Sequence, residues 1–358
     1  MNISDVFSPF QKPDVVKEWQ LGAHLRKSLN HGQVVILTCS DYRGVNMERT
    51  VDFSMLRNEL YQLASIEAQF AFYDLGDLIS GKTLQDTHYI LQEVLLFLFQ
   101  RNCKVIVVGG GSDLSYALFS AVNSFKKSVR YAHFCAGLDI HSEQLEQDLD
   151  ATNFLAKIFD NSSFHVKDFT LLGYQRHLTS PFTLNYLKEI NFDTLRLSEI
   201  LSASYIVEPR LRFADLVTMD ANVLETMREP IAFHPQVNGL NRREICSCMQ
   251  GIGLGVNLSA VGLFNFDFSS SWQNTSLLAQ MIWYLMEGMS IAQTRPRVPN
   301  VETYFVMINE ENFVFKKDIF TDQWYFGASE YLENCLPCSY QDYLQAKNGS
   351  IHPRLLKQ

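Results

Sequence analysis

The segment VIVVGGGSDLSYA, from Val105 to Ala117, decides the fold class of this 358-residue chain. Its first four residues are apolar and β-branched, which is typical of a strand buried on both faces of a parallel sheet. Three glycines follow, and a helical pattern begins at Asp113. The dinucleotide pattern GxGxxG would need glycine where Leu114 stands, and no Gly-Lys-Ser/Thr follows. The segment therefore predicts a tight strand-to-helix turn and disfavours nucleotide binding.

The same alternation of strands and helices continues on both sides of this segment. Apolar β-branched runs predict strands at Val34–Thr38, Phe70–Leu75, Lys104–Val108, Val129–Ile140, Phe169–Leu172, Leu216–Met219 and Ser259–Phe266. Three- and four-residue apolar spacing predicts helices at Phe53–Ala64, Thr83–Gln100, Asp113–Ser124, Asn153–Phe159, Thr183–Glu189, Arg242–Gly253 and Ser276–Met289. Such alternation is characteristic of a mainly parallel sheet covered by helices on both faces. We therefore predict one three-layer α/β/α domain over residues 1–293.

The pattern changes after Gln293. The run from Arg295 to Pro299 holds two prolines, and Tyr304–Ile308 and Asn312–Lys316 then resemble the two strands of a β-hairpin. So short a segment rarely builds a strong core alone. We interpret residues 294–358 as an appendage, a hairpin and a tail, that packs on the main domain.

Composition restricts the class of partner. The formal charge is −9, and no cluster of lysine and arginine recurs on a helical face, so we expect neither nucleic acid nor a membrane as partner. The seven cysteines are odd in number and thinly spread, which indicates reduced thiols. Without a leader-like start or a long apolar run, the chain is expected to be cytoplasmic and to bind a small molecule.

Polar residues follow three of the predicted strands. Ser112 follows the glycine run, LDIHSE spans Leu138–Glu143, and DLVTMDAN spans Asp215–Asn222. Parallel sheets gather their ligand sites at the carboxyl ends of the strands, where these segments fall. Carboxylates and histidine together are typical metal ligands. The three segments therefore suggest a metal site at one edge of the sheet.

These segments resemble the ureohydrolase superfamily, which includes arginase, agmatinase and formimidoylglutamase. The family reads Gly-Gly-x-His, Asp-Ala-His-x-Asp and Ser-Phe-Asp-x-Asp at the same three places. Two further segments are similar to it, DYRGV at Asp41–Val45 and YDLGD at Tyr73–Asp77. The resemblance covers about residues 30 to 290, in order. The chain also resembles a divergent arginase-like branch of Bacteroidetes type.

The resemblance implies a centre of two manganese ions and assigns its ligands. Asp139 and Asp220 would bridge the metals, and together with His141 they would form the catalytic group. Glu143 stands for an aspartate ligand, while Ser112 and Asn222 replace a histidine and an aspartate as weak donors. A hydroxyl and a neutral amide are poor ligands for a hard cation. A single metal on Asp139, His141 and Asp220 is the alternative.

The resemblance also implies where a substrate would lie. Asn265 occupies the place of the glutamate that pairs with the guanidinium in arginases, Asp267 shares its strand parity, and His234 borders the expected pocket mouth. The relay histidine of arginases has no counterpart between Asp150 and Lys157.

Two functions follow. The first is a metal-dependent hydrolase of a C–N bond in a linear amidine or guanidino compound, similar to arginase or formimidoylglutamase. The second is a catalytically impaired ureohydrolase-like protein, a pseudoenzyme, with a role in ligand binding or assembly. The family commonly forms trimers or hexamers, so a homo-oligomer is also expected.

Overall fold

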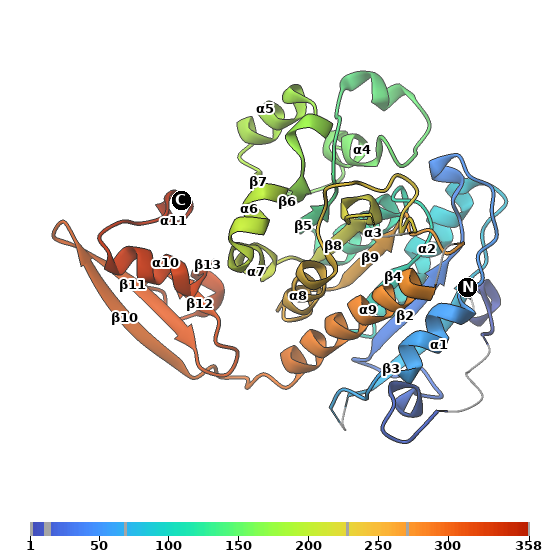
Figure 1. The fold of residues 1–358 in the computed structure, drawn as a ribbon, viewed down its shortest axis with the longest axis horizontal. Helices are drawn as coiled ribbons and strands as arrows, with labels where there is room; N and C mark the ends of the chain where they lie inside the picture. The colour runs from blue at the N-terminus through green and yellow to red at the C-terminus, as the bar shows by residue number, and fades with distance from the viewer. Residues whose placement is uncertain (1–2, 11–15, 68–69, 227–228, 270–271, 357–358) are drawn as a thin grey trace.

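A nine-stranded, mainly parallel sheet forms the centre of the molecule in this computed structural model, which describes residues 3–10, 16–67, 70–226, 229–269 and 272–356. In spatial order its strands are β1 (Phe7–Ser8), β3 (Phe72–Leu78), β2 (Val34–Cys39), β4 (Lys104–Val108), β9 (Ala260–Phe264), β8 (Leu216–Asp220), β5 (Val129–Phe134), β6 (Val166–Tyr174) and β7 (Asp193–Arg196). Only β1, at one edge, runs antiparallel to its neighbour. The predicted parallel sheet is confirmed (Figure 1).

Helices cover both faces of this sheet, which confirms the three-layer arrangement (Figure 1). One face packs against α1 (Ser54–Gln62), α6 (Leu197–Ser202), α7 (Val207–Leu211), α8 (Arg242–Gly253) and α9 (Trp272–Gln293). The other packs against α2 (Leu84–Phe99), α3 (Leu114–Lys126), α4 (Phe154–Asp160) and α5 (Pro181–Glu189). Alternate residues of each central strand enter different layers; Val105 and Val107, for example, face α2 and α3. Burial on both faces explains why these strands have continuous apolar sequences.

The predicted strand Val129–Ile140 is too long. β5 ends at Phe134, the last residue that pairs with β8, opposite Met219. Beyond it the chain runs along the segment before α5, where the Leu138 carbonyl accepts a hydrogen bond from the Ser180 amide. The segment that carries Asp139 is therefore a loop, because no strand remains beside it. Strands β1 and β7 and helices α6 and α7 have no counterpart in the prediction.

The glycine run forms the tight turn that the sequence predicts. Gly109 and Gly110 have φ angles of 87° and 80°, in the left-handed region that favours glycine. A Cβ atom at Gly109 would lie 2.6 Å from the Cys39 carbonyl oxygen. The turn thus lets the loops after β2 and β4 approach closely.

Residues 301–356 form a separate C-terminal module. Its antiparallel sheet has the order β10 (Val301–Ile308), β11 (Glu311–Asp318), β12 (Trp324–Phe326) and β13 (Leu336–Cys338), and helices α10 (Tyr340–Lys347) and α11 (Pro353–Leu356) follow. Its apolar residues form a cluster distinct from those of the central sheet. The predicted hairpin is present with longer strands. The expected tail instead contributes two strands and two helices.

Two observations concern the described chain as a whole. Within the described ranges, no helix combines the length and apolarity that a membrane crossing requires. All seven cysteines are free and buried. Burial raises the pKa of the Cys246 thiol to about 11, so this cysteine is protonated at neutral pH.

The buried His133 should make the free energy of unfolding depend on pH. It is buried in β5, and its Nδ1 lies 2.7 Å from Thr218 Oγ1. Burial lowers its pKa to about 3, whereas the unfolded chain titrates near the ordinary value of 6.5. Between these values only the unfolded state binds the proton, so stability falls as the pH falls. We expect about 2 kcal/mol less stability at pH 5 than at pH 7.5 from this group. Urea unfolding at both pH values should show a smaller difference for His133→Gln; equal differences would contradict this assignment.

Candidate functional site

The structure brings three predicted site residues together at the carboxyl edge of the sheet. Ser112 lies at the turn between β4 and α3, Asp220 ends β8, and Asn265 follows β9. Because β9 lies between β4 and β8, Asn265 lies between the other two. The common carboxyl edge of parallel strands is therefore the candidate site.

Asn265 links the two neighbouring strand ends. It has a φ of 62°, a left-handed conformation that asparagine tolerates better than most residues. Its Oδ1 accepts a hydrogen bond of 3.1 Å from the Ser112 amide, and its Nδ2 donates one of 3.2 Å to Ser112 Oγ. The same side chain also opposes the rise in the pKa of Asp220 that burial causes. One buried amide thus satisfies both the backbone N–H and the hydroxyl of Ser112.

Asp220 and Asn222 use their polar atoms within the protein. Asp220 Oδ1 accepts a hydrogen bond of 2.8 Å from the Asn222 amide. Asn222 Oδ1 in turn accepts one of 2.8 Å from the backbone N–H of His234, which brings that predicted substrate residue to the same edge. Burial raises the pKa of Asp220, and hydrogen bonds from Asn222 and Asn265 oppose this shift. The carboxylate is therefore held by internal donors.

The residues of LDIHSE lie apart from this group, on the loop after β5. The Asp139 and His141 side chains are 61% and 42% exposed, and 3.8 Å separates Asp139 Oδ1 from His141 Nδ1. Glu143 is exposed as well. In the described residues, no hydrogen bond or ion pair connects these side chains with Ser112, Asp220 or Asn222. The loop is held mainly through its backbone, since Gln144 Nε2 donates to the Asp139 carbonyl oxygen.

As arranged here, these residues do not fit a two-manganese centre. Across the part of the chain that the structure describes, no three or more His, Cys, Asp or Glu side chains are gathered where they could hold a metal ion. The Ser112 hydroxyl and the Asn222 amide oxygen, which would have to serve as ligands, already have hydrogen-bond partners. A hard cation prefers several converging carboxylate oxygens, and those of Asp139 and Glu143 point into solvent.

Asp267 contacts residues outside the group formed by Ser112, Asp220 and Asn265. Its Oδ1 lies 3.1 Å from Nη1 of Arg49 and accepts hydrogen bonds from the amide and hydroxyl of Ser269. The carboxylate is thus engaged by the loop that contains Arg49. This contact connects segments that are far apart in sequence, so strand parity alone could not indicate it.

A second group of polar residues, which the sequence did not lead us to predict as part of the site, lies on the segments next to Ser112. Asp41 accepts hydrogen bonds from Arg43 Nε and Nη2, at 2.9 and 2.6 Å, and from the Thr87 hydroxyl at 2.6 Å. Burial would raise the pKa of Asp41, but these donors outweigh it and lower that pKa. His88 Nε2 lies 2.7 Å from Asp113 Oδ2, and burial raises the pKa of Asp113. The resemblance of DYRGV to the family could have identified Asp41. His88 stands within a helical pattern, and no motif there distinguishes it.

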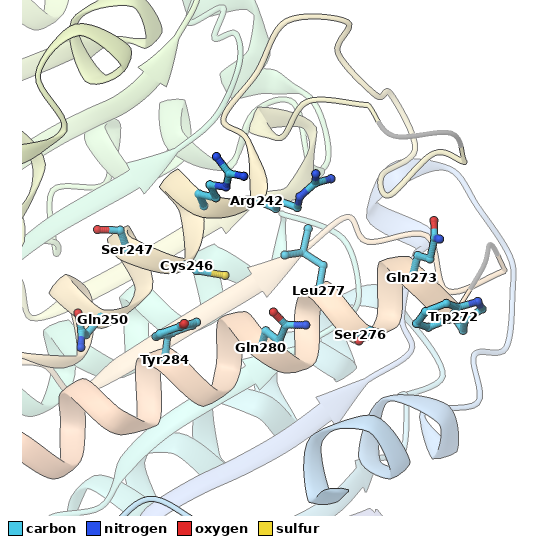
Figure 2. A pocket seen from close by; sticks show the side chains of 11 residues that line it. Arg242, Cys246, Ser247, Gln250, Trp272, Gln273, Ser276, Leu277, Gln280 and Tyr284 are labelled. Carbon is cyan, nitrogen blue, oxygen red and sulfur yellow. The ribbon is translucent and has the colours of Figure 1, made fainter. Parts of the chain in front are cut away.

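A cavity of about 590 Å³ lies elsewhere, between α8 and α9 (Figure 2). Arg242 and Arg243 stand at the start of α8, and Trp272 and Tyr284 come from α9. None of the predicted site residues lines this cavity. It is thus separate from the candidate site.

Comparison with known proteins agrees with this fold. A formiminoglutamase from Trypanosoma cruzi, solved with manganese, has a TM-score of 0.67 at 17% identity, over 77% of this chain and 99% of its own. Formimidoylglutamase from Bacillus subtilis has a TM-score of 0.64 at 16% identity, over 80% and 95%. Agmatine ureohydrolase from Thermoplasma volcanium has a TM-score of 0.60 at 11% identity, over 77% and 96%.

No curated protein sequence matches significantly. The model of the arginase family, however, matches residues 48–286, which include all three motif segments. This match spans more than half of the chain, and the solved structures with a similar fold include formiminoglutamases and an agmatine ureohydrolase. On this evidence the chain belongs to the arginase family.

Proposed function

We propose that this arginase-family chain is a catalytically impaired ureohydrolase-like protein that binds a small amidine or guanidino compound at the carboxyl edge of its central sheet without hydrolysing it. The observation that supports this proposal is the side chain of Asn265. It lies between Ser112 and Asp220, hydrogen-bonds to the amide and hydroxyl of Ser112, and opposes the rise in the pKa of Asp220 that burial causes. The polar atoms at these positions are therefore used in internal hydrogen bonds, whereas a metal centre would need several of them to point towards the ion.

The charges on this side of the molecule favour a cationic ligand. Asp220 ends β8, and the carboxylates of Asp139 and Glu143 lie on the loop after the neighbouring strand β5. Amidinium and guanidinium groups are planar cations whose N–H groups donate to carboxylates in pairs. The exposed Asp139 is available to such a ligand without losing an internal hydrogen bond of its carboxylate. Relatives with this fold are named for the formimino and agmatine compounds on which they act.

Measuring the metal content tests directly whether the protein lacks a metal-dependent activity. We would purify the protein without chelator, incubate it with manganese, desalt it and measure metal by elemental mass spectrometry. We expect close to no manganese per chain, and neither urea nor formamide released from agmatine, arginine or formiminoglutamate. Close to two ions per chain with product release would refute the proposal.

Reversion of the motif substitutions is a second test. The triple variant Ser112→His, Glu143→Asp and Asn222→Asp restores the family's ligand types at the three positions. We expect it to retain manganese that the parent chain does not, because carboxylate and imidazole are better donors than amide and hydroxyl. The same triple variant with Asp220→Asn is the control, and it should lose the metal again. Equal metal content in the parent and the triple variant would contradict this expectation.

Ligand binding is tested separately from metal. Isothermal titration with agmatine in the presence of chelator should show binding to the parent chain. Asp139→Asn should weaken it by about tenfold, the equivalent of one charged hydrogen bond. Asp148→Asn, an exposed aspartate on the same loop, is the matched control and should change nothing. No binding of agmatine or arginine by the parent chain would remove the ligand-binding role.

A metal-dependent C–N hydrolase is the second candidate. The short separation of Asp139 and His141, together with Asp220 at the end of β8, favours it. It requires the loop after β5 to bring Asp139, His141 and Glu143 towards Asp220. The metal measurement above separates the two candidates.

A further inference from the structure

The edge strand of the C-terminal module is open. β10 is eight residues long and pairs only with β11, in a register without a bulge from Val301 to Ile308. It holds neither proline nor lysine. Natural edge strands are usually shortened, bulged, charged or covered, because a free edge pairs with other strands. Within the described residues, β10 is neither short, bulged nor covered, and Glu302 near its start is its one charged residue.

The hairpin geometry determines which backbone groups face outward. Asn309 and Glu310 form a two-residue loop with φ angles of 47° and 67°, and Ile308 lies opposite Glu311. The pair that flanks such a loop exchanges both of its hydrogen bonds, and hydrogen bonding then alternates along the strand. The N–H and C=O groups of Thr303, Phe305 and Met307 therefore point away from β11.

The side chains of these residues are exposed as well. Phe305 and Met307 are 67% and 76% exposed, although both are large and apolar. On the opposite face, Tyr304 and Val306 pack into the core of the module. The main domain contacts the module near β13, at the other edge of its sheet (Figure 1). An open backbone edge thus coincides with exposed apolar side chains.

We propose that β10 pairs antiparallel with β10 of a second copy of this chain, with Phe305 opposite Phe305. A two-fold axis through this pair joins two four-stranded sheets into one of eight strands. Thr303 of each copy then lies opposite Met307, so the outward backbone groups of both strands meet. Glu302, the one charged residue of β10, lies opposite Ile308, so no like charges oppose each other within the pair. This interface is independent of the function proposed for the carboxyl edge of the central sheet.

Sedimentation velocity on the full chain over a range of concentrations tests the interface. We expect a reversible monomer–dimer equilibrium. Phe305→Lys places two ammonium groups opposite each other and should weaken dimerisation at least about tenfold. Phe182→Lys, at another exposed phenylalanine, on α5, is the matched control and should leave the dimer intact. A chain that stays monomeric at every concentration, or an assembly unaffected by Phe305→Lys, would overturn the proposal.

Cysteine cross-linking tests the register. Residues that lie opposite as a hydrogen-bonded pair have Cα atoms about 5.5 Å apart, within the range of a disulfide. Phe305→Cys should therefore give a disulfide-linked dimer on mild oxidation, since the native thiols are buried. Two copies of Met307→Cys would lie four residues out of register, about 13 Å apart, and should cross-link poorly. Preferential cross-linking of Met307→Cys would contradict the proposed pairing.

Discussion

Replacing Arg212 with methionine should lower the free energy of unfolding by about 3–4 kcal/mol and loosen the C-terminal module. Its guanidinium is 1% exposed and lies 2.5 Å from Glu208 Oε2. It also donates hydrogen bonds to the carbonyl oxygens of Trp324 and Cys338, and it stacks on the Tyr325 ring. Methionine would fill part of the space but remove this donor from both buried carbonyl oxygens, and it would leave Glu208 with the Gln323 amide as its remaining side-chain donor among the described residues. Unpaired buried acceptors are costly, because water cannot replace the lost donor.

Two measurements check this expectation. Urea unfolding gives the free-energy change, and hydrogen exchange over residues 301–347 reports whether the module loosens first. Arg210→Met is the matched control, because Arg210 on α7 is 11% exposed but pairs with Asp193, whose side chain is 40% exposed. A pair with a solvated carboxylate contributes little, about 1 kcal/mol. Equal losses for the two variants would show that burial of Arg212 does not stabilise the module.

Replacing Asp74 with asparagine should cost about 3–5 kcal/mol. Asp74 is 1% exposed in β3, and its Oδ2 accepts a hydrogen bond of 2.8 Å from Arg57 Nε on α1. It also accepts hydrogen bonds from the Tyr61 hydroxyl and, at 2.8 Å, from the Gly76 amide. The neutral amide would leave the guanidinium of Arg57, itself 4% exposed, with less compensating charge.

Asp77→Asn provides the control for this prediction. Asp77 contacts the same guanidinium, with 2.7 Å between its Oδ1 and Arg57 Nη1, but its side chain is 35% exposed. In this variant Arg57 keeps its buried partner Asp74, and water already screens the partly exposed Asp77 carboxylate, so we expect a loss of about 1 kcal/mol or less. Chemical unfolding should therefore give the parent and Asp77→Asn similar free energies of unfolding, and Asp74→Asn a much lower one. A larger loss for Asp77→Asn than for Asp74→Asn would contradict the idea that burial sets the cost of each substitution.

The fold was largely predictable because its signals are local. The strand Lys104–Val108 and the helix Arg242–Gly253 are confirmed to the residue, since apolar runs and helical spacing are properties of neighbouring positions. The end of β5 was not predictable, because a strand continues only while a partner strand lies beside it. The apolar residues Leu138 and Ile140 suggested a longer strand but are buried in a loop.

The candidate site was predictable in its residues more than in its arrangement. The motif positions identified Ser112, Asp220 and Asn222, which lie at one edge of the sheet, and Asp139, His141 and Glu143, which lie on the neighbouring loop. The hydrogen bonds of Asn265 were not predictable, because they depend on its left-handed backbone and on its distance from a residue 153 positions away. Metal binding by Asp139, His141, Glu143 and Asp220 stays a prediction.

Residue types and their short-range order were enough to predict the α/β class and the arginase family, because both signals are local. The position of β9 between β4 and β8, which places Asn265 between Ser112 and Asp220, is visible only in the folded molecule. Strand order follows from how all the helices and strands pack together, and no local pattern encodes it. The same holds for Arg212, a charged residue whose burial arises only when the C-terminal module meets α7.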